Sequence, residues 1–364
     1  MLPQLQQHEQ ITTTTWEGRP ILVAPPHLAR ERPARLVFLV PAALDTGRRW
    51  SVGAPVGGGF AGVRFRGLEP DCLNSGSFWM DTNLLTYFFL LITVVLCWAS
   101  SLLVGMSALA FSSLVGLFLH RIEPIGLLWI LLAGISIWVG SDLAFSKWLR
   151  WTAMVIFLFM AVALSHHMLP GFNNLLVFDK VQFSADSAPF TMYLNFDKTV
   201  VGIFIYLFLL KERESMWNKK DSLVAVNTLA ILIASMLPLA LATHYVRIDL
   251  KLPPQTWLWA LNNLFFVCVA EETLFRGLIQ GGLANLVPNI FRWKWLPLVV
   301  SSLLFGLDHY EGGLPYILLA AFAGVFYGYA YWKTNKIKSS IFVHFGLNLT
   351  HFLFFSYPSM IAAH

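Results

Sequence analysis

From Trp257 to Ile279 the chain reads Trp-Leu-Trp-Ala-Leu-Asn-Asn-Leu-Phe-Phe-Val-Cys-Val-Ala-Glu-Glu-Thr-Leu-Phe-Arg-Gly-Leu-Ile. An apolar run of this length can cross a membrane, but two carboxylates and a guanidinium interrupt it. Each charge at the centre of a bilayer costs roughly 2.5 to 3.5 kcal/mol, so the three together need a reason. Glu272 and Arg276 are four residues apart, which favours an ion pair on one helical face. Glu271 lies about 100° further around the helix and has no local partner there.

Composition points to lipid as the solvent of the chain. It is 57% hydrophobic and only 12% charged, whereas soluble domains carry about 25% charged residues. We therefore expect an all-α fold, a polytopic transmembrane helix bundle of about 8 spans, with a poorly structured N-terminal extension. The apolar segments that qualify wholly or in part as spans are 84–120, 124–140, 151–169, 222–244, 256–270, 314–332 and 339–358. The first is too long for one upright span, so a turn is expected near Gly105.

The basic residues predict the orientation of the chain. The net charge is +5, but the Lys and Arg side chains sit in short loops and form no continuous basic face, which argues against nucleic acid as a partner. From residue 120 onward, alternate loops carry eleven and five Lys or Arg residues. By the positive-inside rule the richer set is cytoplasmic. That set is Lys147, Arg150, Lys211, Arg213, Lys219, Lys220, Arg292, Lys294, Lys333, Lys336 and Lys338, and the poorer set is Arg121, Lys180, Lys198, Arg247 and Lys251.

Three regions differ in composition. Residues 1–79 contain eight Arg and no Lys, against six Arg and eleven Lys in the remainder. They are expected to be a poorly structured extension, either a basic arm or the product of a start codon assigned too far upstream, with Met80 as the true initiator. Residues 80–254 are expected to form N-terminal transmembrane helices, and residues 255–360 a catalytic transmembrane core. Cys72, Cys97 and Cys268 have neither disulfide nor zinc-finger spacing.

Two more polar clusters follow on separate apolar segments. Phe305 precedes His309 by four residues, and His344 precedes Asn348 by four, so each pair shares one helical face. A lone His at a helix end is more often a cap or an interfacial residue, and a polar stripe often joins helices by hydrogen bonds. Three such clusters within about 80 residues favour one shared site.

The pattern Glu-Glu-x-x-x-Arg, Phe-x-x-x-His, His-x-x-x-Asn resembles the CPBP family of CAAX prenyl proteases and of bacteriocin-processing and immunity-related membrane proteins. Residues Glu271, Glu272, Arg276, Phe305, His309, His344 and Asn348 fill its motif positions in order. The resemblance covers about residues 255–355. It implies an intramembrane endopeptidase that hydrolyses a membrane-associated CAAX-like or small peptide substrate in the lipid bilayer.

The residue types suit that chemistry. Glu271 is the expected general base toward water, and His309 would orient the water. His344 and Asn348 would donate hydrogen bonds to the developing oxyanion. Glu272, Arg276 and Phe305 would support the site's geometry. This mechanism needs no cofactor or metal.

Alternatives remain open at the level of sequence. Glu271, His309 and His344 are also a possible Zn ligand set for a membrane metallopeptidase. Buried carboxylates and His side chains also occur in proton-coupled transporters, and some members of the resembled family are non-catalytic immunity proteins. The expected location is a bacterial cytoplasmic (inner) membrane, crossed several times.

Overall fold

A computed structural model describes residues 12–16, 19–23, 82–211, 215–286 and 294–361. The chain separates into two compact units, Met1–Leu68 and Glu69–His364. In the first unit, β1 (Thr12–Trp16) and β2 (Arg19–Val23) pair antiparallel. The expected extension at residues 1–79, with Met80 as a start, otherwise falls outside the described residues.

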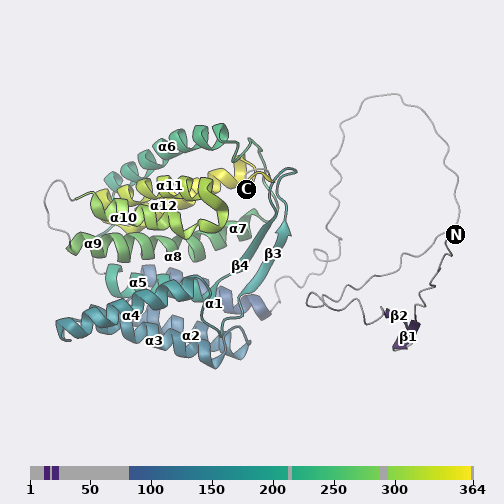
Figure 1. Ribbon diagram of the computed structural model, residues 1–364. Helices are drawn as coiled ribbons and strands as arrows, with labels where there is room; N and C mark the ends of the chain where they lie inside the picture. The colour runs from purple at the N-terminus through teal and green to yellow at the C-terminus, as the bar shows by residue number, and fades with distance from the viewer. Residues whose placement is uncertain (1–11, 17–18, 24–81, 212–214, 287–293, 362–364) are drawn as a thin grey trace, which may run out of the picture. The chain divides into compact units, whose positions relative to one another are not determined.

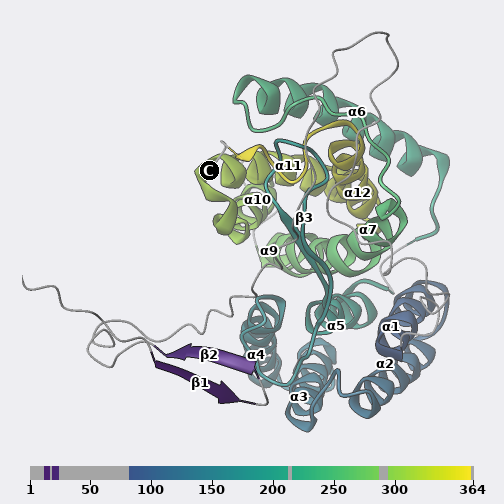
Figure 2. The same cartoon turned by 90° about the vertical axis from the view of Figure 1, so that its right-hand side faces the viewer.

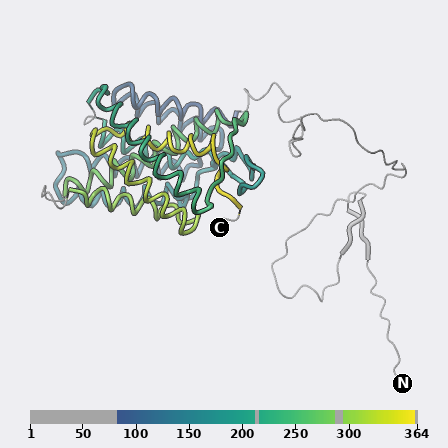
Figure 3. The backbone as a smooth tube through the Cα atoms, turned by 90° about the horizontal axis from the view of Figure 1, so that it is seen from above, coloured from purple at the N-terminus to yellow at the C-terminus, as the bar shows by residue number. Residues whose placement is uncertain are grey.

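The second unit is a bundle of helices that run side by side, as expected for an all-α fold (Figure 1). Its first helices are α1 (Thr82–Ala99), α2 (Leu102–Phe118), α3 (Pro124–Ser141), α4 (Lys147–Ser165) and α5 (Phe196–Ile205), which continues as the π-helix η4 (Tyr206–Leu210). Next come α6 (Lys219–Ala242) and a long rod made of α7 (Thr256–Asn262), η6 (Asn263–Cys268), α8 (Val269–Glu272), η7 (Thr273–Gln280) and α9 (Gly281–Leu286). The remaining helices are α10 (Leu296–Asp308), η9 (Tyr310–Gly312), α11 (Gly313–Thr334) and α12 (Ile337–Phe354). Figure 3 shows the same packing from above.

The helices confirm an integral membrane protein. Within the described residues, six are long and apolar enough to cross a membrane, and α2 and α10 are shorter apolar helices. The turn expected near Gly105 lies at Ser100 and Ser101 instead, where the Ser101 side chain accepts a hydrogen bond from the Val104 amide and caps α2. Gly105 itself packs against Leu207 of η4 inside the bundle.

One pair of strands was not predicted from the sequence. β3 (Leu175–Val181) and β4 (Phe190–Leu194) form an antiparallel hairpin between α4 and α5. Figure 2 shows β3 crossing one end of the helix bundle. Aromatic contacts hold the hairpin there: Phe183 lies 5.0 Å from the ring of Phe352, and Phe190 lies 5.0 Å from the ring of Tyr357. The hairpin is therefore fixed to the last turn of α12 and to Tyr357 beyond its end.

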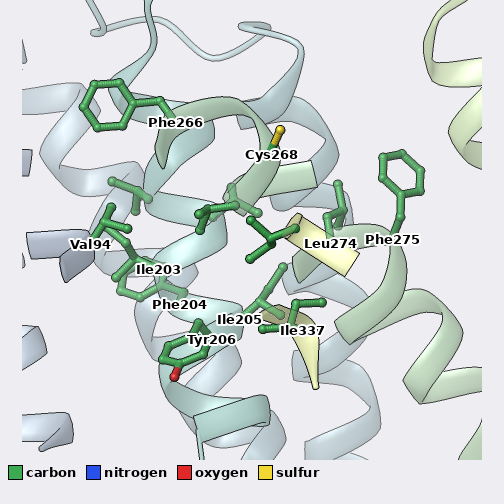
Figure 4. Packing of buried hydrophobic residues seen from close by; sticks show 14 of the residues in the cluster. Val94, Ile203, Phe204, Ile205, Tyr206, Phe266, Cys268, Leu274, Phe275 and Ile337 are labelled. Carbon is green, nitrogen blue, oxygen red and sulfur yellow. The ribbon is translucent and has the colours of Figure 1, made fainter. Parts of the chain in front are cut away.

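The core is centred on α5. Apart from Lys198, every residue of this helix is buried, so it is surrounded by other helices. Figure 4 shows side chains of α1, α5, the η6–η7 region and α12 meeting around it. Gly202 permits the closest approach, because a Cβ atom there would lie 2.8 Å from the Cα atom of Ala270. This contact brings α5 directly beside α8 and the two glutamates.

Candidate active site

Glu271 lies in the middle of the rod that runs from Thr256 to Leu286. It is 6% exposed, and it has a partner that sequence reasoning missed: the Lys198 ammonium lies 2.6 Å from its Oε1 atom. The sequence placed Lys198 in a loop, but it belongs to the first turn of α5. The only sequence signal was a single Lys at the start of an apolar run. The carboxylate is therefore balanced by a cation from another helix.

The neighbouring Glu272 is fully buried and faces a different set of groups. Its Oε1 atom lies 2.7 Å from Nδ1 of His344, and its Oε2 atom accepts a hydrogen bond from the Ser340 hydroxyl. Arg276 Nε lies 3.2 Å from the same Oε2 atom, which confirms the expected i, i+4 pair. Glu272 thus joins its own helix to α12.

Arg276 extends this framework to α10 and α11. Its Nη2 atom donates a hydrogen bond to the Gly324 carbonyl at 3.1 Å, and its guanidinium carbon lies 4.4 Å from the centre of the Phe305 ring. The centre of the Tyr327 ring lies 5.2 Å from the same guanidinium carbon. A buried cation flanked by a carboxylate and two aromatic faces is well compensated. Phe305, the first residue of the second motif, is therefore a packing partner of Arg276.

The two motif histidines turn one nitrogen each toward protein groups. His309 Nδ1 donates to the Phe305 carbonyl at 2.8 Å, since a carbonyl can only accept. This leaves Nε2 of the neutral ring as an acceptor. His344 Nδ1 faces Glu272, and its Nε2 atom lies 3.9 Å from Glu271 Oε2. His344 therefore stands between the two carboxylates, with its ring stacked on Tyr327.

Asn348 lies one helical turn beyond His344. Its Nδ2 atom donates to Asn263 Oδ1 at 3.2 Å, and Asn263 also accepts a hydrogen bond from the Cys268 thiol. Sequence reasoning did not single out Asn263. Its place in the Asn262-Asn263 pair, about two and a half turns before the glutamates in an apolar run, was the available signal.

These residues line one cavity of about 650 Å³. Glu271, His309, His344 and Asn348 all reach it, whereas Glu272 and Arg276 lie behind its wall. The π-helices η6 and η7 directly flank α8, and such segments often occur at functional sites because they re-aim the side chains around them. At the mouth, burial raises the pKa of Tyr245 to about 12, so its phenol stays protonated and can donate.

The donor set is a poor fit for the alternative zinc site. Glu271 is bound to an ammonium at 2.6 Å, and His344 Nδ1 is bound to Glu272. Across the described residues, no three His, Cys, Asp or Glu side chains are grouped as metal ligands would be. A cation such as Zn²⁺ beside Glu271 would also face the positive charge of Lys198.

The comparisons with known proteins point to one family. Residues 253–350 match the family model described as type II CAAX prenyl endopeptidase Rce1-like. This stretch contains all three motif clusters. A search of curated proteins and a search of solved structures each found no match.

Proposed function

The chain belongs, through residues 253–350, to the CPBP family of CAAX-protease-type membrane proteins, and from this premise we propose that it is an intramembrane endopeptidase that uses Glu271 to activate water. The observation that carries the proposal is the pair of adjacent glutamates with different surroundings. Glu271 faces the cavity, while Glu272 is closed off behind it. One carboxylate is placed to react and the other to support.

The proposed reaction begins with water at Glu271 Oε2, the oxygen that Lys198 does not hold. Glu271 takes a proton from this water as it attacks the peptide carbonyl. Nε2 of His309 accepts the water's other hydrogen and so orients it. The tetrahedral intermediate then expels the amine, which receives the proton from Glu271.

The oxyanion requires hydrogen-bond donors beside the peptide carbonyl. Asn348 Nδ2 donates to Asn263 Oδ1 at 3.2 Å and makes a weak 3.9 Å contact with the Cys268 sulfur, which its second hydrogen would exchange for the oxyanion. His344, when protonated on both nitrogens, donates to Glu272 from Nδ1 and has its Nε2–H available to the oxyanion. Loss of one such donor typically costs about 100- to 1000-fold in rate.

Lys198 supports the carboxylate form of Glu271, and this contact favours the glutamate mechanism over the zinc mechanism. A transporter or an immunity protein needs no cavity in which a carboxylate, two imidazoles and an amide converge. The convergence of Glu271, His309, His344 and Asn348 on one cavity therefore favours hydrolysis.

The test is cleavage of a membrane-anchored peptide by purified protein. Glu271→Gln keeps the size of the side chain and removes its proton-accepting power, so cleavage should fall by at least about 1000-fold. Glu123→Gln, at an exposed carboxylate before α3, is the matched control and should cleave normally. Full activity in Glu271→Gln would remove Glu271 as the base.

A further inference from the structure

The first feature concerns the two ends of the bundle. At one end, the Lys211 ammonium donates to the Cys97 carbonyl, and the Lys336 ammonium donates to the Met216 carbonyl, both at 2.6 Å. We call this the lysine end. At the other, Asn173 N–H donates to the Arg121 carbonyl and His166 pairs with Asp308. We call this the hairpin end, because β3 and β4 lie there (Figure 2).

The basic residues of the loops are divided unequally between these two ends. The helices alternate in direction, so the nine described residues of the richer basic set lie at the lysine end and the poorer set lies at the hairpin end. Lys198 leaves the poorer set, because its ammonium is bound to Glu271 inside the bundle. Nine described basic residues at the lysine end then stand against four at the hairpin end. The positive-inside rule places the lysine end in the cytoplasm and the hairpin end on the opposite side.

The cavity opens toward the hairpin end. Glu271 is fifteen residues from each end of the Thr256–Leu286 rod, about 22 Å by helical rise, and so lies near the middle of the membrane. From there the cavity lining continues to Pro189 before β4, Tyr245 after α6 and Glu311 in η9.

The way from the lysine end is filled. Three side chains at four-residue spacing along the rod are each at most 3% exposed: Glu272, Arg276 and Gln280. Arg276 and Gln280 are bonded to the Gly324 and Gly328 carbonyls of α11. These side chains separate the cavity from the cytoplasmic face.

We propose that the substrate reaches Glu271 from the non-cytoplasmic face and is a translocated polypeptide, held at or in the outer half of the membrane. This inference rests on the proposed peptidase function. It predicts a substrate whose cleaved bond has crossed the membrane, in contrast to a lipid-modified chain end displayed in the cytoplasm.

The test places single cysteines at the two ends of otherwise active protein. Tyr310→Cys at the hairpin end replaces a 61% exposed side chain, and Met216→Cys at the lysine end replaces a 90% exposed one. Cys97 and Cys268 are buried, and Cys72 is changed to Ser in both. A membrane-impermeant thiol reagent should label Tyr310→Cys in intact cells and Met216→Cys only after permeabilisation. Any other labelling pattern overturns the inference.

A second readout separates this inference from the proposed function. Sealed right-side-out vesicles should cleave an added library of acylated, quenched-fluorescence decapeptides, inverted vesicles should not, and detergent-solubilised protein should cleave it in both preparations. Cleavage by inverted vesicles alone overturns the sidedness and leaves the peptidase intact. Absence of cleavage in detergent contradicts the peptidase function itself, while the labelling result still stands.

An independent observation concerns how a peptide lies in the cavity. Consecutive residues of β4 from Phe190 to Tyr193 all line it, although successive side chains of a strand point to opposite faces. The cavity therefore reaches the strand's edge. The C-terminal segment already pairs just before β4, where Ala188 N–H donates to the Ser359 carbonyl. Within the described chain, no backbone hydrogen bond to a segment other than β3 was found for Phe190–Leu194.

A buried acceptor faces the same space. Asn262 is 6% exposed and lines the cavity, and its Oδ1 atom has no hydrogen-bond partner among the described residues. A buried carbonyl oxygen without a donor is costly. A peptide N–H supplied by the substrate would satisfy it.

From these features we infer that the substrate binds in extended form, adding as a strand along β4 and donating one backbone N–H to Asn262. An N-methyl scan of a decapeptide cleaved by the wild-type protein tests this. Since a strand directs alternate N–H groups to one neighbour, methylation should slow cleavage at every second position. Asn262→Leu should slow the unmethylated peptide about tenfold and remove the methylation penalty at the one further position whose N–H group Asn262 accepts. A scan without alternation, or with every penalty retained in Asn262→Leu, overturns the inference.

Discussion

The ion pair between Lys198 and Glu271 allows the sharpest test of the site. Lys198→Met keeps a long unbranched side chain and removes the charge. At 2.6 Å and an effective dielectric constant of about 20, the attraction between the two charges is about 6 kcal/mol. The cost of burying them offsets much of this. Loss of one partner from a buried pair is expected to lower the free energy of unfolding by about 3 to 5 kcal/mol, because the other charge is left uncompensated.

The expectation is specific to the pair, so it is measured as a double-mutant cycle. Lys198→Met, Glu271→Gln and the double variant are unfolded reversibly in mixed detergent micelles. If the contact exists, the double variant should be more stable than the sum of the two single losses predicts, by at least about 2 kcal/mol. Glu123→Gln serves as the second site in a control cycle with Lys198→Met and should give additive losses. Additivity within about 0.5 kcal/mol in the Glu271 cycle would refute the ion pair.

Three further outcomes are expected. Arg276→Ala should lower the free energy of unfolding by about 3 to 5 kcal/mol, measured in the same micelles, since Glu272 loses its buried counter-charge; a loss below 1 kcal/mol would contradict that pairing. Gly202→Ala should destabilise the protein by about 1 to 3 kcal/mol, because its Cβ atom would lie 2.8 Å from Ala270 Cα; unchanged stability would mean that α5 and α8 are further apart. Purified protein should keep its peptidase activity after dialysis against a strong chelator, and activity that is lost and then restored by Zn²⁺ would replace the glutamate mechanism.

The helical fold was predictable because membrane-spanning helices carry their signal in long apolar runs. The β3–β4 hairpin was not, since its residues sit in a polar connection with aromatic side chains at irregular spacing. Its stability comes from rings on α12 and after it, such as Phe352 and Tyr357, that are distant in sequence. Strand pairing of this kind depends on packing partners more than on local propensity.

The residues of the candidate site that belong to its three motifs were predictable from the sequence. Spacing of four residues puts Glu272 with Arg276, and His344 with Asn348, on single helical faces, and the structure brings all these residues together. Lys198 could not be predicted from these motifs, because it lies on another helix, 73 positions before Glu271 in the chain. No periodicity links two residues that meet only through the Gly202 contact between their helices.

The two adjacent carboxylates show how surroundings divide roles that sequence alone leaves equal. Glu272 has every oxygen engaged, by His344, Ser340 and Arg276, so it has no free acceptor to offer to water. Glu271 has one oxygen held by Lys198 and the other 3.9 Å from His344 Nε2, beside the cavity. Because the two side chains are chemically identical, the roles of Glu271 and Glu272 could be exchanged only by exchanging the groups that surround them. This predicts that Glu272→Gln and Glu271→Gln fail differently: both leave a buried cation without its counter-charge and lower stability, but only Glu271→Gln should abolish cleavage by the protein that remains folded. Equal residual cleavage per folded protein in the two variants would contradict this division of roles.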